Sequence, residues 1–467
     1  MKVLVLSLLY FLLTIMPAQA NQFFGPVTIA DEMEMGREVD QKIMKSGAVT
    51  TDPEINKYVV DVVTKLVENK PKMPFPIKVR VISNRAMNAF AVPGGYIYIF
   101  TGLILGVQNE GQFAAVVAHE LAHASQRHVA KRMEKMKKTQ VLSTIATIGG
   151  VALGMSGAGA DAGKALVIGS QAAAQTAFLD YTRTNERDAD HVGLTNLIAA
   201  GYNPEDMPAT FEVMKTKSGR MPSDYPTYLS THPGLNERIS YLKGRILRMP
   251  PEILTRTTDN TEFKRAQTII RAIYPDAEVA LGYYTNLAEN KYSGMDYLGK
   301  AVLLQRLKKY DDAEIAALKA VDRLPHDYMV QREAGIIYYK TKQYDKAAIH
   351  FQKASLFNPR DGETLYYLAM MFQQQGQHKQ AMQTMKSAQE ASPTLSMIRL
   401  AYGRMLGKDK QFFAAHLQLA YGYFYQRDAK KFSISKKKLQ ALAKTEEEKE
   451  ELKQLITTTQ GFGKNRR

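Results

Sequence analysis

The sequence predicts a mainly α-helical protein in which a domain with a small β-sheet is followed by an α-α superhelix. Three observations lead to this prediction: apolar residues at helical spacing dominate the chain, two short segments have the pattern of strands, and a 34-residue repeat runs through the C-terminal part. The chain has 467 residues, of which 45% are hydrophobic and 23% are charged. This length and composition suit two or three folded units with substantial cores.

Residues 1–20 have the features of a secretory signal peptide. Lys2 gives a basic start, residues 3–16 are apolar, and Ala18 and Ala20 are small residues suited to cleavage after Ala20. The sequence contains no cysteine and has Asn21 after the expected cleavage point, so it offers neither a cysteine lipid anchor nor a disulfide framework. We therefore expect an exported mature protein, and the absence of cysteine is compatible with a periplasmic location.

The formal net charge of +16 has much of its excess late in the chain. A basic face suits acidic partners or anionic lipid headgroups, and peripheral contact with anionic lipid is one interpretation. The other is a solvated helical tail, residues 430–467, because the block 446–448 is acidic. No nucleic-acid motif accompanies the charge, so no nucleic-acid partner is expected. The lysines concerned are Lys430, Lys431, Lys436, Lys437, Lys438 and Lys444.

The elements of the first domain follow from cap, strand and turn signals. Thr51 or Asp52 caps a helix that continues to Glu68 with apolar residues at helical spacing. A proline-rich segment then leads to a strand at 77–82 and, after a Pro-Gly-Gly turn, to a second strand at 96–100. A small sheet is thus expected before the helix that contains residues 119–123.

Residues 141–179 are rich in Ala, Gly, Ser and Thr and allow two interpretations. The first half is uncharged over about the length of a membrane span, which favours a transmembrane segment. Glycines and hydroxyl residues interrupt it, which favours a soluble helical hairpin or a lid over an active site.

The C-terminal half repeats every 34 residues. Small residues at fixed positions let two antiparallel helices approach closely, and a proline ends the second helix, which is the pattern of tetratricopeptide repeats. We expect repeats at about 294–327, 328–361, 362–395 and 396–429. The repeated positions are Ala301, Gly335, Ala369 and Gly403; Ala313, Ala347, Ala381 and Ala415; Ala320, Ala354, Ala388 and Gly422; and Pro325, Pro359 and Pro393.

His119, Glu120 and His123 form an HExxH pattern in an apolar stretch that is typical of a helix. Histidines four residues apart lie on one face of a helix, so both imidazoles can bind one ion while the glutamate stands beside it. This pattern predicts a zinc peptidase. Zinc lowers the pKa of a bound water to about 7, and Glu120 is expected to act as general base and to pass the proton to the departing amine.

A hydrolytic zinc site needs a third protein ligand, for which Glu186 is the candidate. Glu186 and Asp190 are four residues apart and hence on one helix face, so Glu186 can ligate while Asp190 accepts a hydrogen bond from a ligand imidazole. His128 lies nine residues after His119 without the glycine of the extended HExxHxxGxxH motif, so we expect a structural or supporting role.

His232 precedes a proline and a predicted helix that carries Arg238. One interpretation is a loop histidine near a helix cap. In a second, His232 and Arg238 donate hydrogen bonds to the oxyanion of the tetrahedral intermediate. In a third, His232 occupies the open zinc position and holds the enzyme idle.

The segments HELAH, ERDAD, NAFAVPGGYIYIFTGLI and THPGLNER, in order along the chain, resemble the HtpX and Ste-type gluzincin metallopeptidases. This resemblance implies a zincin-like metallopeptidase domain at 21–265, followed by a tetratricopeptide-repeat domain at 266–429. It also implies one zinc per chain, bound by His119, His123 and Glu186. Glu120 is then the catalytic base, Asp190 supports a ligand, and His232 is a regulatory or transition-state residue.

The resemblance further implies that an extended peptide substrate pairs with the strand near Tyr96, Ile97 and Tyr98, beside Asn88, Ala89 and Phe90. HtpX-type members carry transmembrane helices, and this exported chain is expected to differ from them in that respect. A lid or hairpin is therefore the preferred interpretation of residues 141–179.

The resemblance, together with the signal peptide and the repeats, implies two possible functions. The first is a zinc endopeptidase for quality control and assembly of outer-membrane β-barrel proteins, in which the repeats recruit misfolded or stalled clients or the assembly machinery. The alternative is mainly an assembly chaperone or adaptor whose proteolysis stays latent.

Overall fold

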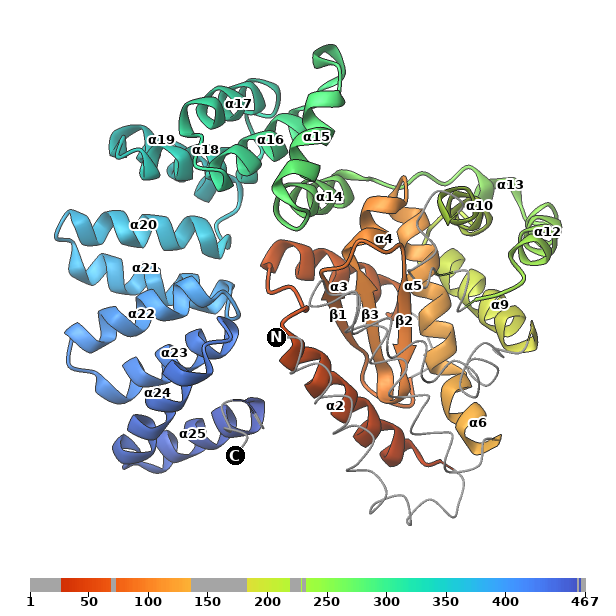
Figure 1. Ribbon diagram of the computed structural model, residues 1–467, viewed down its shortest axis with the longest axis horizontal. Helices are drawn as coiled ribbons and strands as arrows, with labels where there is room; N and C mark the ends of the chain where they lie inside the picture. Colours follow the sequence, from red (N-terminus) through yellow and green to blue (C-terminus); the bar gives the residue numbers. More distant parts are fainter. Residues whose placement is uncertain are drawn as a thin grey trace. The chain divides into compact units, whose positions relative to one another are not determined.

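The computed structural model describes residues 27–68, 73–135, 183–218, 228, 232–459 and 462 (Figure 1). The predicted signal peptide at 1–20 and the predicted lid or hairpin at 141–179 lie outside these residues. The chain divides into two compact units, one with residues 1–50 and 54–270 and one with residues 51–53 and 271–467. The domain bounds expected from the sequence stay a prediction.

The described part of the first unit begins with two helices, α2 (Ile29–Ser46) and α3 (Pro53–Val67). Thr28 caps α2 through a reciprocal pair of hydrogen bonds with Asp31, which satisfies backbone N–H groups at the helix start. The predicted helix at 52–68 corresponds to α3. Its apolar residues at helical spacing are buried, and they are Ile55, Val59, Val62, Val63 and Leu66.

A three-stranded sheet follows, consisting of β1 (Lys78–Ile82), β2 (Ala89–Val92) and β3 (Tyr96–Phe100). The strand order is β1-β3-β2, with β3 parallel to β1 and antiparallel to β2. The turn between β2 and β3 needs glycine, because Gly94 and Gly95 have φ angles of 77° and 84°.

The strand expected to pair with a substrate is in the wrong place for that role. β3 is the central strand, so both of its edges already bond to β1 and β2, and Tyr96, Ile97 and Tyr98 are buried. β2, which contains Ala89 and Phe90, is an edge strand among the described residues. β3 therefore has no free edge for a peptide. The outer edge of β2 pairs with no other described strand, although the N–H groups of Ala89 and Ala91 donate to the side chains of Asn88 and Glu120.

Helix α5 (Glu110–Ser125) lies beside β2 and is buried along almost its whole length. Asn109 caps it by accepting a hydrogen bond from the backbone N–H of Gln112. α5 packs against two later helices of the unit, α9 and α10. The other helices in the described part of the first unit are α4 (Thr101–Gly106), α6 (His128–Lys135), α9 (Arg183–Ala199), α10 (Asp206–Ser218), α12 (Leu235–Ile246) and α13 (Pro251–Leu254), and α14 (Thr261–Ile273) runs across the division between the units.

The second unit consists of antiparallel helix pairs. The small residues of the repeat allow close contact within a pair: an added Cβ at Gly335 would lie 2.7 Å from the ring of Phe351, and one at Gly403 would lie 2.9 Å from the carbonyl oxygen of Ala415. The helices are α15 (Ala277–Asn286), α16 (Gly294–Arg306), α17 (Tyr310–Arg323), α18 (Tyr328–Lys340), α19 (Tyr344–Phe357), α20 (Gly362–Gln374), α21 (His378–Ala391), α22 (Ser396–Lys408), α23 (Phe412–Tyr425), α24 (Ala429–Leu442) and α25 (Glu446–Thr458).

The predicted fold class is confirmed, because helices dominate both units, one small sheet is present, and helix pairs follow in register with the repeat. In the tail, Lys430, Lys431, Lys437 and Lys438 are exposed on α24. Contact of this helix with anionic lipid stays a prediction. None of the helices in the described part of the chain is long and apolar enough to span a membrane.

Candidate metal centre

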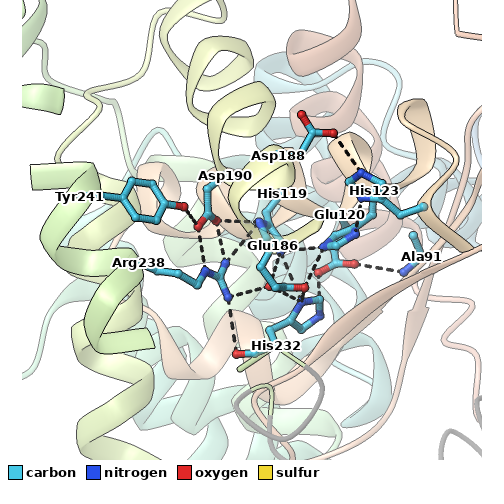
Figure 2. A network of polar contacts seen from close by, with 11 residues as sticks. Ala91, His119, Glu120, His123, Glu186, Asp188, Asp190, His232, Arg238 and Tyr241 are labelled. Carbon is cyan, nitrogen blue, oxygen red and sulfur yellow. Dashed lines mark hydrogen bonds and ion pairs between the residues drawn. The ribbon is translucent and has the colours of Figure 1, made fainter. Parts of the chain in front are cut away.

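Four side chains converge on one point in the first unit (Figure 2). His119 and His123 come from α5, Glu186 from the first turn of α9, and His232 from the segment before α12. One nitrogen or oxygen atom of each lies within 4.8 Å of the others. Each of these residues is at most 2% exposed.

The inward-facing atoms of this group are close enough to bind a single ion. His119 Nε2 lies 3.0 Å from His123 Nε2 and 3.3 Å from His232 Nδ1. Both oxygens of Glu186 lie 3.1 Å from His232 Nδ1, and Glu186 Oε1 lies 3.4 Å from His123 Nε2. At this distance two imidazole nitrogens either share a proton or bind a cation between them. Imidazole nitrogens with a carboxylate oxygen are a donor set that zinc prefers.

Helical spacing and one glycine bring the ligand atoms together. His119 and His123 are one turn apart on α5, as are Glu186 and Asp190 on α9. Gly193 lets α9 approach α5 closely, because an added Cβ there would lie 3.2 Å from both the carbonyl oxygen of Ala118 and the backbone nitrogen of His119. A larger residue at position 193 would push Glu186 away from the histidines.

Asp190 and Arg238 lie beside the ligand group, to its left in Figure 2. Asp190 Oδ1 lies 3.0 Å from His119 Nδ1, so His119 can donate from Nδ1 while its Nε2 faces the other ligands. Arg238 donates to Asp190 from Nε at 2.7 Å and from Nη2 at 2.6 Å, and its Nη1 lies 2.7 Å from Glu186 Oε2. Tyr241 also donates to Asp190.

These contacts do not favour the oxyanion role predicted for Arg238. All three of its guanidinium nitrogens are engaged by the carboxylates of Asp190 and Glu186, and the residue is 2% exposed. Arg238 therefore compensates the charge of two buried carboxylates and fixes their positions.

The charges around this point favour a cation. Burial opposes the charged form of His119, but hydrogen bonds with Asp190 and Glu186 raise its pKa to about 9, so a metal ion bound here has to displace the proton of this imidazole. Burial acts to raise the pKa of Glu186, yet the neighbouring histidines hold that pKa well below its usual value. Burial lowers the pKa of His123 to about 3, which keeps this imidazole neutral and able to bind a metal.

Glu120 lies beside the ligand group with its two oxygens in different surroundings. Oε2 accepts a hydrogen bond of 3.1 Å from the backbone N–H of Ala91 in β2. Oε1 is buried and accepts no hydrogen bond from the residues that the structure describes, although His232 Nε2 lies 3.5 Å away. Burial raises the pKa of Glu120, which makes this carboxylate a stronger base.

The site also contains residues for which the sequence suggested no definite role. His128 Nδ1 lies 2.9 Å from His123 Nδ1, and His128 Nε2 lies 3.0 Å from Asp188 Oδ2. The ring of Tyr228 stacks on His232 with a centroid distance of 4.2 Å. Asp188 lies two residues from Glu186, which alone gives no sign that it contacts a histidine of α6.

Comparisons with known proteins agree with this geometry. Residues 53–246 match Peptidase family M48, so the chain contains an M48 domain. A putative beta-barrel assembly-enhancing protease of Vibrio cholerae is 31% identical over 307 residues, which cover 65% of this chain and 62% of the relative. The beta-barrel assembly-enhancing protease of Escherichia coli is 29% identical over 244 residues, which cover 52% of this chain and 50% of the relative.

A mitochondrial metalloendopeptidase, OMA1 of Schizosaccharomyces pombe, is 27% identical over 226 residues, which cover 48% of this chain and 63% of the relative. The chain thus spans between half and about two thirds of the length of these curated relatives. The predicted resemblance to gluzincin metallopeptidases is confirmed, and the family implies a metal cofactor.

Proposed function

We propose that this chain, whose residues 53–246 form a peptidase family M48 domain, is a zinc-dependent endopeptidase of the periplasm. Its role is quality control and assembly of outer-membrane β-barrel proteins, and its substrates are misfolded or stalled members of that class. The observation that carries the proposal is the convergence of His119, His123 and Glu186 beside Glu120. The names of the bacterial relatives, which are beta-barrel assembly-enhancing proteases, support the assignment of the substrate class.

Zinc bound by His119, His123 and Glu186 supplies a Lewis acid for peptide-bond hydrolysis. Glu120 acts as the general base, because Ala91 holds one of its oxygens and the other accepts no hydrogen bond from the described residues. Burial raises the pKa of Glu120, so it takes a proton from the attacking water and later donates that proton to the leaving amine. Asp190 and Arg238 keep His119 and Glu186 in place.

The substrate peptide pairs with the outer edge of β2 in an extended conformation. The carbonyl oxygen of Asn88 accepts a hydrogen bond from Phe100 in β3, and Phe90 pairs with Tyr98 of β3. The backbone groups of Ala89 and Ala91 therefore form the outer edge of β2. Because the N–H of Ala91 points at Glu120, a peptide along this edge passes the proposed base. Of the predicted substrate residues this placement retains Ala89, because Asn88 and Phe90 pair with β3 and because Tyr96, Ile97 and Tyr98 belong to β3 itself.

His232 acts as a latch on this site. Its Nδ1 lies 3.1 Å from the oxygens of Glu186 and 3.3 Å from His119 Nε2, while its Nε2 lies 3.5 Å from Glu120 Oε1. One imidazole therefore fills a fourth ligand position and faces the base at the same time. Peptide hydrolysis requires His232 to move away from both.

Replacing His232 with alanine is expected to raise kcat/KM for casein by roughly 10- to 100-fold, if the open state is about 1–10% populated in the wild type. The measurement is the initial rate at equal zinc content. His191→Ala is the matched control, because His191 is an exposed histidine of the same domain that contacts Arg245. A rate that falls tenfold in His232→Ala would instead support the oxyanion role.

The helix pairs of the second unit favour a second candidate function, an assembly chaperone or adaptor that binds clients or the assembly machinery. The two functions separate in cells that lack their own copy of the protein. An endopeptidase alone predicts that both Glu120→Gln and a chain ending before residue 294 fail to restore levels of folded β-barrel proteins. A chaperone predicts that Glu120→Gln restores them and the shortened chain does not, with immunoblots confirming equal protein levels. Equal loss in both variants contradicts an independent chaperone function.

A further inference from the structure

A chain of polar contacts leads from His123 to the protein surface. His123 Nδ1 lies 2.9 Å from His128 Nδ1, and His128 Nε2 lies 3.0 Å from Asp188 Oδ2. His128 is 2% exposed, whereas the side chain of Asp188 is 46% exposed. Figure 2 shows Asp188 and His123 on the side of the site away from Arg238.

Only one arrangement of protons makes every contact in this chain a hydrogen bond while leaving His123 Nε2 free to bind a metal. A neutral His123 whose Nε2 lone pair faces the ligand group carries its proton on Nδ1. His128 Nδ1 must then accept that hydrogen bond, so the proton of His128 is on Nε2. His128 Nε2 in turn donates to the carboxylate of Asp188, which can only accept when ionised.

The backbone conformation of Arg127 places His128 beside His123. Arg127 has a φ of 55°, a left-handed conformation that is unfavourable for a residue with a side chain. Arg127 is held there by hydrogen bonds from Nε to Glu32 Oε1 at 2.5 Å and from Nη2 to the carbonyl oxygen of Val27 at 2.6 Å. This sharp turn separates α5 from α6 and brings the ring of His128 to a centroid distance of 5.0 Å from that of His123.

We propose that His128 and Asp188 are positioning residues that fix the Nδ1–H tautomer and the ring orientation of His123. Through His123 they set the affinity of the site for zinc, as partners of metal-bound histidines do in general. His119 has the equivalent support from Asp190, which is buried and paired with Arg238. The inference rests on the proposed function, because it requires that His123 binds zinc.

Asp188, the exposed end of this series of polar contacts, gives the cleanest test. Asp188→Ala in the full-length protein is expected to raise the zinc dissociation constant roughly 10- to 100-fold, the usual effect of losing a partner of a ligand histidine. The measurement is competition for zinc with a chromogenic chelator. Glu237→Ala is the matched control, because Glu237 is an equally exposed carboxylate, at 46%, that pairs with Arg187. We expect its dissociation constant to stay within about twofold of the wild type.

Substitutions at His128 test the hydrogen bond itself with two side chains of similar size. Asparagine places Oδ1 near the position of Nδ1 and can still accept from His123, whereas leucine cannot. We expect His128→Leu to weaken zinc binding roughly 10- to 100-fold and His128→Asn to retain most of the affinity. In the His128→Leu background, Asp188→Ala should have no further effect, because its route to His123 is already broken.

An unchanged zinc dissociation constant in Asp188→Ala overturns this inference and leaves the proposed function intact. Equal losses in His128→Asn and His128→Leu also overturn it, because they would show that only the packing of the ring matters. A wild-type protein that binds no zinc overturns both the inference and the proposed function.

Discussion

Replacing Glu120 with glutamine is expected to lower kcat for casein hydrolysis by roughly 10²- to 10⁴-fold, the range that a positioned general base contributes. Glutamine has nearly the same shape and can still accept the hydrogen bond from Ala91, but it cannot take up a proton at neutral pH. The ligand atoms of His119, His123 and Glu186 are unchanged, so zinc binding should persist. The measurement is the initial rate of wild type and variant at equal zinc content.

Glu110→Gln provides the control for this experiment, because it is the same substitution at the start of the same helix. Glu110 accepts a hydrogen bond of 2.8 Å from the hydroxyl of Tyr202, and a glutamine oxygen can accept it equally well. We expect its kcat to remain within about twofold of the wild type. Wild-type activity in Glu120→Gln would show that another group is the base.

The sequence predicted those parts of the site that depend on spacing within one helix. His119 and His123 on α5, and Glu186 and Asp190 on α9, are each one turn apart, and this follows from helical geometry alone. The 34-residue repeat could also be predicted from the sequence. The close contact between Gly335 and Phe351 requires a small residue, and small residues recur at this position of each repeat.

The features that sequence reasoning missed depend on contacts between distant segments. The Pro-Gly-Gly turn before Tyr96–Phe100 indicates a strand, but only the pairing with β1 and β2 shows that this strand has no open edge. The position of Arg238 after a turn gives no sign that its guanidinium is committed to Asp190 and Glu186. The contact between His128 and His123 depends on the left-handed backbone of Arg127, which residue type does not predict.

Replacing Glu186 with glutamine is expected to have the largest effect on metal binding. A neutral amide removes the only carboxylate of the group of four, and the ligand set then lacks the charge that balances a divalent ion. The zinc dissociation constant should rise by more than the roughly 10- to 100-fold typical of supporting residues, and activity should be lost with the metal. Asp190 still compensates Arg238, so the fold should be retained, as near- and far-ultraviolet circular dichroism will check. Glu212→Gln, at a half-exposed carboxylate on α10, is the control.

The most direct test of the central claim is a titration of zinc into metal-free protein while peptide hydrolysis is followed. For the wild type, activity should rise linearly and level off at about one zinc per chain, as a single site with three protein ligands requires. Glu186→Gln should show no rise over the same range, and Glu212→Gln should follow the wild type. Wild-type activity that does not depend on zinc, or zinc binding by Glu186→Gln as tight as that of the wild type, would contradict the assignment of His119, His123 and Glu186 as the metal ligands.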